Sequence, residues 1–237
     1  MVASIYLLFI IQGMNTASES TVNNRLRTIG ERVAAAALTA GRGKEEIHLI
    51  AVSKGHSQAD VVAMIAAGQR CFGENRVQEA EAKFSALSQR NELELHLIGP
   101  LQTNKAKLAV QLFDVIETVD RPSLIEALAK AVAATGRRPR FFIEVNIGGE
   151  AQKAGVRPDA LEPLLSLARE HGLCIEGLMT IPPQGQPPEP YFRELAALAR
   201  QHGLKEVSMG MSADFETAIA CGATYIRVGT ALFGSRA

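Results

Sequence analysis

The sequence has no excess of charge of either sign. Its 25 lysine and arginine residues are balanced by 25 aspartate and glutamate residues in a chain of 237 residues. Proteins that bind nucleic acid or an anionic membrane generally carry a basic patch. We therefore expect neither nucleic acid nor membrane as a partner, and we interpret the short basic stretch GRRPR (136–140) as a solvated turn before a strand.

Cysteine is scarce as well. The three cysteines, Cys71, Cys174 and Cys221, have neither CxxC spacing nor the spacing of metal ligands, and each lies beside an apolar run. Free cysteine packs as a small hydrophobic residue, and unpaired cysteines are typical of a reducing compartment. The prediction is a cytoplasmic protein with three core cysteines and no metal site.

A long hydrophobic segment is also missing. The apolar stretch from Val2 to Ile11 is shorter than the roughly 20 residues of a membrane-spanning helix, and no lysine or arginine precedes it as in a signal peptide. Met14 begins the polar segment that follows. We interpret residues 1–13 as an upstream over-read of the start site, with an export signal or anchor as the alternative, and residues 14–237 as a single domain.

The sequence does contain a regular alternation of short apolar runs with helix-like segments. Eight runs are expected to form strands: 47–54, 70–75, 94–99, 114–119, 140–147, 174–181, 206–211 and 225–230. Strands that alternate with helices favour a parallel sheet, and their number favours an α/β fold of the (β/α)8 TIM-barrel type.

Both ends of the expected barrel depart from the usual order. Expected helices end at glycines, as the segment 121–136 ends at Gly136. The eighth strand is followed only by ALFGSRA, so the last helix is truncated. An extra N-terminal helix is expected over 22–40, and we expect it to take the place of the missing one.

A lysine ends the first expected strand, in the stretch LIAVSKGHS (49–57). Strand alternation places Ile50, Val52 and Lys54 on one face, and if that face lines the barrel, Lys54 points into its mouth, where barrel enzymes carry their sites. A desolvated lysine has a lowered pKa and becomes an amine suited to Schiff-base formation. The alternative is an ordinary strand-end lysine in solvent.

Two turns of small residues follow the seventh and eighth expected strands, at SMGMSADF (208–215) and RVGTALFG (227–234). We expect Ser212 to be a helix N-cap and Gly210 to permit close backbone approach. Loops after these two strands are the usual phosphate site of the fold. Ser212, Gly229 and Thr230 are therefore predicted to bind a phosphate, although Asp214 nearby would compete with an anion.

Arg227 lies within an apolar strand and needs a partner. An ion pair with Glu144 or Glu74 would satisfy it, and the alternative is that it faces a ligand. A lysine, a phosphate site and an arginine in one barrel mouth together suggest pyridoxal 5′-phosphate (PLP), with the lysine on its aldehyde and the arginine at its pyridine nitrogen.

Seven stretches together resemble the pyridoxal phosphate homeostasis protein family, whose fold is similar to the N-terminal barrel of alanine racemase. In chain order they are AVSKGHS, FGENRVQEAEAK, HLIGPLQTNKAK, IEVNIGGEAQKAGV, GLMTIPP, SMGMSADFETAI and YIRVGTALFG, and the match as a whole runs from about Val22 to the C-terminus. The resemblance implies PLP held as a Schiff base on Lys54, phosphate contacts from Ser212 and Gly229–Thr230, and Arg227 at the pyridine nitrogen. An arginine stays protonated there, which makes the ring a weaker electron sink.

Other residues of these motifs are expected to shape the pocket, namely Asn75, His96, Asn146 and Met209. His96 equally fits a core histidine, and Asn146 equally fits a turn asparagine. Lys105 is either a solvated lysine at a helix start or a second anion contact.

The resemblance implies a PLP carrier in the cytoplasm, without turnover, which serves PLP-dependent apoenzymes. The alternative is a PLP-dependent amino acid racemase, which needs an acid/base on each face of the reacting carbon. Alanine racemases supply the second base, a tyrosine, from a C-terminal domain that we do not expect here, and none of Tyr6, Tyr191 and Tyr225 suits that role. A cofactor-free Schiff-base aldolase is a third option, but it leaves Arg227 without a role. We expect a monomer.

Overall fold

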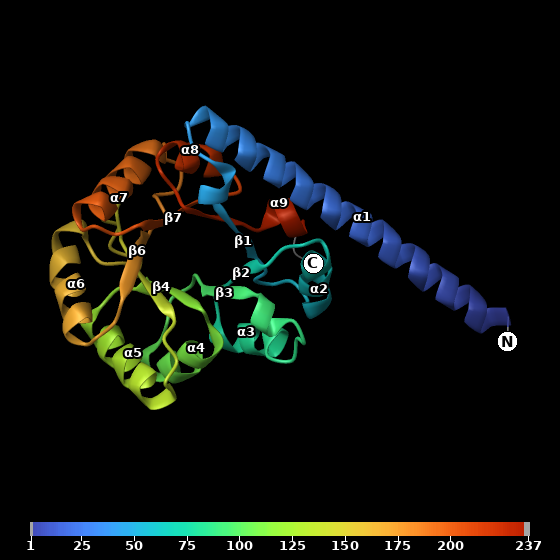
Figure 1. The fold of residues 1–237 in the computed structure, drawn as a ribbon, viewed down its shortest axis with the longest axis horizontal. Helices are drawn as coiled ribbons and strands as arrows, with labels where there is room; N and C mark the ends of the chain where they lie inside the picture. Colours follow the sequence, from blue (N-terminus) through green and yellow to red (C-terminus); the bar gives the residue numbers. More distant parts are fainter. Residues whose placement is uncertain (1, 235–237) are drawn as a thin grey trace.

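Eight parallel strands close into a barrel in sequence order, and helices surround it (Figure 1). The computed structural model describes residues 2–234, with side chains described for residues 21–234. The strands are β1 (His48–Val52), β2 (Cys71–Glu74), β3 (Glu94–Leu97), β4 (Val115–Val119), β5 (Arg140–Glu144), β6 (Ile175–Met179), β7 (Glu206–Met211) and β8 (Tyr225–Val228). Each strand lies within its predicted run, so the predicted (β/α)8 barrel is confirmed.

The helices occupy the outer layer. They are α1 (Val2–Thr39), α2 (Gln58–Ala66), α3 (Val77–Phe84), α4 (Ala106–Leu112), α5 (Pro122–Thr135), α6 (Leu161–Glu170), α7 (Glu189–Gln201), α8 (Phe215–Ala220) and α9 (Thr230–Phe233). Four short 3-10 segments join them to the strands: Lys44–Glu46, Arg90–Glu92, Thr103–Lys105 and Pro158–Ala160. At the end of α5, Gly136 has a φ of 70°, a conformation that glycine adopts without strain and that lets the chain turn towards β5.

Strand alternation divides the apolar residues into two cores. The inward face contributes a small cluster inside the barrel, made of Ile50, Val52, Ile98, Val115, Phe142 and Tyr225. A much larger cluster fills the layer between the strands and the helices. Gly73 on β2 leaves room inside the barrel, because a β-carbon there would lie 2.8 Å from Ile50 Cγ2. The predicted face of β1 is therefore the inner one.

The expected exchange of helices at the two chain ends is confirmed. Helix α9 is a single turn, and α1 packs against both α8 and α9. The N-terminal half of α1 extends away from the barrel (Figure 1). Residues 2–13 belong to that half, and their interpretation as an over-read stays a prediction.

The cysteine prediction is correct for one residue in three. Cys221 is buried, Cys71 is half-buried and Cys174 is exposed. Cys174 precedes the first residue of β6 and Cys71 opens β2, so both lie at strand starts rather than within strands. An apolar run beside a cysteine therefore does not by itself bury it.

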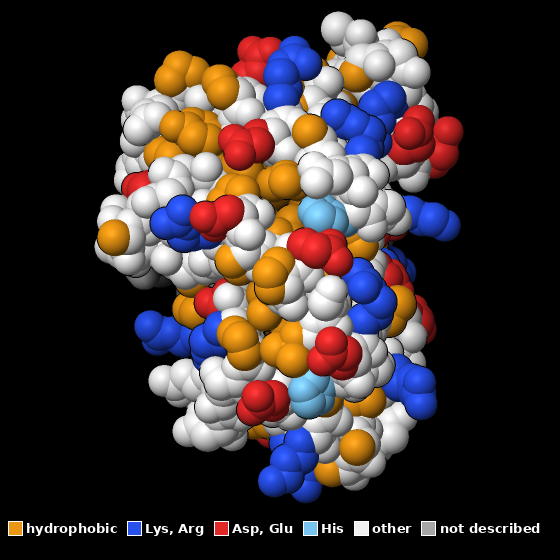
Figure 2. Space-filling view, turned by 90° about the vertical axis from the view of Figure 1, so that its left-hand side faces the viewer, with side chains coloured by type: hydrophobic (Ala, Val, Ile, Leu, Met, Phe, Trp, Pro, Cys, Tyr) orange, Lys and Arg blue, Asp and Glu red, His pale blue; other side chains and the backbone are white. Residues whose placement is uncertain are grey.

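Charge is distributed evenly on the face over α6 and α7, where acidic and basic side chains alternate with hydrophobic ones (Figure 2). Among the described residues, no helix combines the length and the apolar character needed to cross a membrane.

Candidate functional site

A cavity of about 310 Å³ opens at the carboxyl ends of the strands, the mouth of the barrel. It collects six of the seven residues predicted to bind the cofactor: Lys54, Asn75, Ser212, Arg227, Gly229 and Thr230. These residues follow or end β1, β2, β7 and β8. The seventh, Met209, is fully buried in the outer core and does not line the cavity, whereas Met211 does.

Lys54 lies two residues beyond the end of β1, which stops at Val52 rather than at the lysine as predicted. The flanking backbone is held on both sides. Lys83 Nζ donates to the Ser53 carbonyl over 2.6 Å, and the Gly55 N–H donates to Glu79 Oε1 over 2.7 Å. The turn that carries Lys54 is therefore fixed before any ligand binds.

A second lysine near this turn has a structural role. Lys83 Nζ is buried and contacts Glu74 Oε1 at 2.8 Å and Glu79 Oε1 at 2.7 Å. Burial raises the pKa of Glu74, although Lys83 and Ser53 oppose it through hydrogen bonds. Glu74 therefore pairs with Lys83 and not with Arg227, which removes one of the two partners considered for that arginine.

Arg227 projects from β8 into the barrel and lines the cavity, with 4% of its surface exposed. Its guanidinium donates to Ser208 Oγ and to the Thr180 carbonyl, both over 2.7 Å. Burial lowers the pKa of Arg227, and the charges of Glu117 and Glu144 oppose that shift. These two fixed bonds orient the guanidinium towards the cavity.

The turn after β7 differs from the prediction. Helix α8 begins at Phe215 with Asp214 as the N-cap residue, so Ser212 is not the N-cap. The Asp214 carboxylate accepts the Met211 N–H over 2.6 Å, which closes a turn around Ser212 and Ala213. Ser212 therefore lines the cavity, and Thr230 faces it from the start of α9.

Gly210 makes the close backbone approach that its sequence position suggested, but it approaches helix α8. Its φ is 90°, and an added β-carbon would lie 2.5 Å from Ala218 Cβ on α8. The end of β7 therefore packs directly onto α8, which places Ser212 at the mouth.

The structure places His96 and Asn146 outside the cavity. His96 is fully buried inside the barrel. The Asn146 side chain donates to the Glu150 carbonyl over 2.8 Å and accepts the Glu150 N–H over 3.1 Å. Asn146 is therefore a turn asparagine, and His96 is a core histidine.

Sequence reasoning missed the remaining lining residues, chiefly His56, Ile98, Ile181 and Met211. Ile98 was detectable by strand alternation, because it shares the inner face of β3 with His96. His56 follows Lys54 within the same turn and stacks on Phe233, with ring centroids 4.7 Å apart. That contact joins α9 to the turn of β1 and has no signal in either segment alone.

A second cavity of about 610 Å³ lies beside the first and shares Asn75 with it. Lys105 lines it together with Arg76 and Arg121. Of its two predicted roles, a contact to a second anion fits this position, and it stays a prediction.

A chain of hydrogen bonds runs from Arg227 down the inside of the barrel. Ser208 Oγ, which accepts from Arg227, donates to Glu117 Oε2 over 2.6 Å. Glu117 Oε1 lies 2.6 Å from His96 Nδ1, and His96 Nε2 lies 2.7 Å from Glu94 Oε1. Burial opposes a charge on His96, yet its contacts with Cys71, Glu117 and Glu94 hold its pKa well above the ordinary value. The mouth is thus connected to the opposite end, the base of the barrel.

Known proteins resemble this chain over nearly its whole length. The family model described as the alanine racemase N-terminal domain matches residues 26–237. A pyridoxal phosphate homeostasis protein of Aquifex aeolicus is 40% identical over 222 residues, covering 90% of this chain and 97% of the relative.

Solved structures agree with this. PipY of Synechococcus elongatus, determined with PLP bound, superposes with a TM-score of 0.74 at 41% identity, covering 87% of this chain and 100% of that chain. An alanine racemase of Clostridium difficile gives a TM-score of 0.68 at 12% identity, covering 90% of this chain and 56% of that chain, which indicates the fold alone. The predicted alanine racemase-like barrel is therefore confirmed.

Proposed function

The chain belongs to the pyridoxal phosphate homeostasis protein family, and on this premise we propose that it binds PLP in the cavity at the barrel mouth and takes part in intracellular PLP homeostasis. The observation that carries the proposal is the convergence of Lys54, Ser212, Arg227 and Thr230 on one cavity. Lys54 and Thr230 are 176 positions apart in the sequence, and the barrel brings them to one cavity.

The residues of the cavity fit the cofactor chemically. Its volume of about 310 Å³ is at the lower end of the roughly 300–1,000 Å³ of small-molecule sites. Val52, Ile98 and Ile181 offer apolar walls for a flat aromatic ring, whereas Ser212 and Thr230 offer hydroxyl donors for a phosphate.

Lys54 is the residue proposed to hold PLP covalently. Its ε-amino group would hold the cofactor through the aldehyde, with loss of one water molecule. Bound PLP supplies an electron sink for bonds at an attached amine carbon. Arg227 would donate a hydrogen bond to the ring nitrogen. Because guanidinium keeps its proton, it would not protonate that nitrogen, which favours storage over demanding chemistry.

We propose a carrier without turnover, and the positions of the tyrosines support it. Tyr225 lies at the base, where its hydroxyl accepts from Arg140 over 3.0 Å, and the hydroxyl of Tyr191 on α7 donates to Gln186. The side chain of Tyr6 lies outside the described residues. No tyrosine with a described side chain therefore lines the cavity as a second base.

One observation keeps racemase activity as the second candidate. His56 lines the same cavity as Lys54, and an imidazole can serve as an acid or a base. Incubation with single enantiomers of small amino acids, followed by chiral chromatography, tests it. Turnover that His56→Gln removes would establish the racemase and overturn the carrier.

The wider role of the carrier is part of the proposal. We propose that it is a cytoplasmic monomer that passes PLP to apoenzymes, a role in keeping with the name of its relatives, which is limited to PLP homeostasis. Mixing the loaded protein with a PLP-dependent apoenzyme, in the presence of a scavenger of free PLP, measures direct transfer. Activation no faster than from free PLP at the same concentration would contradict delivery.

Absorbance of the loaded protein, followed by borohydride reduction and peptide mapping, tests the binding site itself. The purified protein, loaded with PLP, is treated with borohydride and digested, and the peptides are mapped by mass. A pyridoxyl group on Lys54 is the expected result. A protein that takes up no PLP, or a label on another lysine, would overturn the proposed site.

A further inference from the structure

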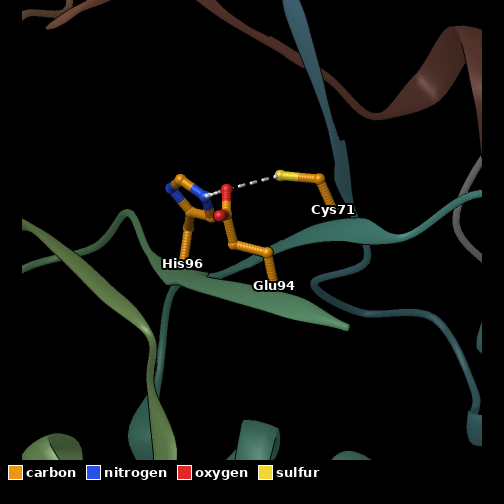
Figure 3. A group of neighbouring side chains, drawn as sticks. All are labelled: Cys71, Glu94 and His96. Carbon is orange, nitrogen blue, oxygen red and sulfur yellow. Dashed lines mark hydrogen bonds and ion pairs between the residues drawn. The ribbon is translucent and has the colours of Figure 1, made fainter. Parts of the chain in front are cut away.

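Three potential metal ligands meet at the base of the barrel, at the end opposite to the cavity. Cys71 opens β2, and Glu94 and His96 lie on β3. One ligand atom from each side chain lies within 4.8 Å of the other two. Figure 3 shows the Glu94 carboxylate between the His96 ring and the Cys71 sulfur.

Strand register explains why these residues converge. Cys71 is the direct partner of Glu94 across β2 and β3, and Glu94 and His96 share one face of β3 because they are two residues apart. The set therefore comes from pairing between strands and has none of the sequence spacings by which metal sites are usually found. Because the sequence shows no such spacing, sequence analysis alone predicted no metal site.

We propose that Cys71 Sγ, Glu94 Oε1 and His96 Nε2 bind a zinc ion, with the fourth tetrahedral position left to water. One sulfur, one nitrogen and one oxygen are a donor set that suits zinc, whereas calcium and magnesium prefer oxygen alone. Sites with three protein ligands and a water are a common zinc arrangement.

The outer contacts of two ligands resemble those of built metal sites. Glu117 Oε1 lies 2.6 Å from His96 Nδ1, so a carboxylate orients the imidazole and leaves Nε2 towards the metal. Arg140 donates to Glu94 Oε2 over 2.6 Å, which leaves Oε1 as the ligand oxygen. His96 and Glu117 are fully buried, so this orientation is fixed by packing.

Coordination requires the ligand side chains to adjust their spacing. Two zinc bonds of about 2.0–2.1 Å at a tetrahedral angle place nitrogen and oxygen roughly 3.3 Å apart. His96 Nε2 and Glu94 Oε1 are 2.7 Å apart, and Cys71 Sγ and Glu94 Oε1 are 3.7 Å apart. The Glu94 side chain is 37% exposed, so it is free to move away from His96 Nε2, and its exposure gives the ion a path from solvent.

The charge of the site balances. The contacts of His96 with two carboxylates require a proton on each ring nitrogen. A zinc ion displaces the Nε2 proton and the Cys71 thiol proton, and both protons pass to solvent. The two charges of zinc thus replace the charges of two protons, and the carboxylates of Glu94 and Glu117 keep a cation beside them.

Metal titration of the tag-free, PLP-loaded protein tests the proposal after treatment with a chelator. Calorimetry with zinc chloride is expected to give one ion per chain. Cobalt(II) is expected to give the visible d–d bands of a tetrahedral site, at wavelengths longer than those PLP absorbs. It is also expected to give a near-ultraviolet thiolate charge-transfer band, which is read as the difference from the spectrum of the metal-free, PLP-loaded protein. No stoichiometric zinc binding, or a cobalt spectrum without thiolate character, would overturn the proposal.

Variants assign the ion to these residues. Cys71→Ala and Glu94→Gln are each expected to weaken zinc binding by at least about tenfold, and Cys71→Ala removes the thiolate band. Cys174→Ser, at the exposed cysteine, is the matched control and should bind like the parent protein. Equal affinity in Cys71→Ala and the control would overturn the assignment.

Alkylation gives a readout on the unmodified sequence, in case a variant fails to fold. Zinc is expected to protect Cys71 from iodoacetamide and to leave Cys174 reactive, as followed by mass mapping. Protection of neither or of both cysteines would contradict the site.

Discussion

The two ends of the barrel interior both carry polar side chains, but they arrange them in opposite ways. At the mouth, Lys54, Ser212 and Arg227 surround a cavity. At the base, Glu94 contacts His96 at 2.7 Å and Arg140 at 2.6 Å. Polar groups around a cavity favour binding, whereas removing one member of a buried set of paired polar groups lowers stability because its partner is left unpaired. Mutations at the two ends should therefore separate these properties.

The largest expected effect is at the mouth. Lys54→Ala should abolish the borohydride-stable attachment of PLP, because no other amine lines the cavity among the described residues, while the circular dichroism spectrum stays that of a folded barrel. Lys83→Met is the contrasting variant. It keeps the Lys54 amine, so the borohydride-stable adduct should still form, but stability should fall because Glu74 loses its buried partner and the Ser53 carbonyl loses its donor. An adduct retained in Lys54→Ala would place the anchor elsewhere.

The largest effect at the base should be on stability. His96→Leu removes the partner of the buried Glu117 carboxylate and should cost about 3–5 kcal/mol in urea unfolding. His48→Leu is the matched control, because His48 stacks on Tyr225 at the exposed edge of the same end, and it should cost less than about 1 kcal/mol. Loss of PLP attachment in a folded His96→Leu protein would show that the two ends are not separable.

A carboxyl group beside Arg227 makes the mouth sensitive to pH. Burial raises the pKa of Glu144 to about 7, Asp120 adds to the shift and Arg227 opposes it. The folded state then holds this proton more tightly than the unfolded chain, so stability should fall as pH rises from about 4.5 to about 7 and then level off.

Urea unfolding at pH 5 and pH 8 measures this effect. The difference in unfolding free energy between the two pH values should shrink by up to about 3 kcal/mol in Glu144→Gln, since each pKa unit corresponds to about 1.4 kcal/mol. Glu126→Gln, at an exposed position on α5, should leave the pH dependence unchanged. A Glu144→Gln protein with the pH profile of the parent would contradict the raised pKa.

The fold was predictable from the sequence because the eight apolar runs are separated by helices that end at glycine, and both signals are local. The alternation on β1 placed Ile50 and Val52 inside the barrel for the same reason. Most residues of the barrel mouth were predictable as well, since every parallel strand brings its carboxyl end to the same side of the barrel.

What the sequence did not predict depends on contacts between distant segments. Cys71 and Glu94 meet through strand register, and Asp214 displaces Ser212 from the N-cap through a bond to the backbone of Met211. Met209 shows the limit of a motif, because its neighbour Met211 reaches the cavity and Met209 packs outside the barrel. Periodicity predicts which face of a strand a residue lies on, but it does not predict which residue it contacts there.

The smallest expected effects are at the phosphate end of the mouth. Ser212→Ala and Thr230→Ala should each weaken PLP retention by about 1–3 kcal/mol, the value of a hydrogen bond to a charged group, without changing the free energy of unfolding. Ser212→Ala should leave the free energy of unfolding unchanged because Asp214, and not Ser212, is the N-cap residue of α8. Thr230→Ser keeps the hydroxyl and should retain PLP like the parent protein, and dialysis followed by absorbance measures all three variants. Unchanged retention in both alanine variants would place the phosphate elsewhere, and the neighbouring cavity with Arg76, Lys105 and Arg121 would then be the next site to test.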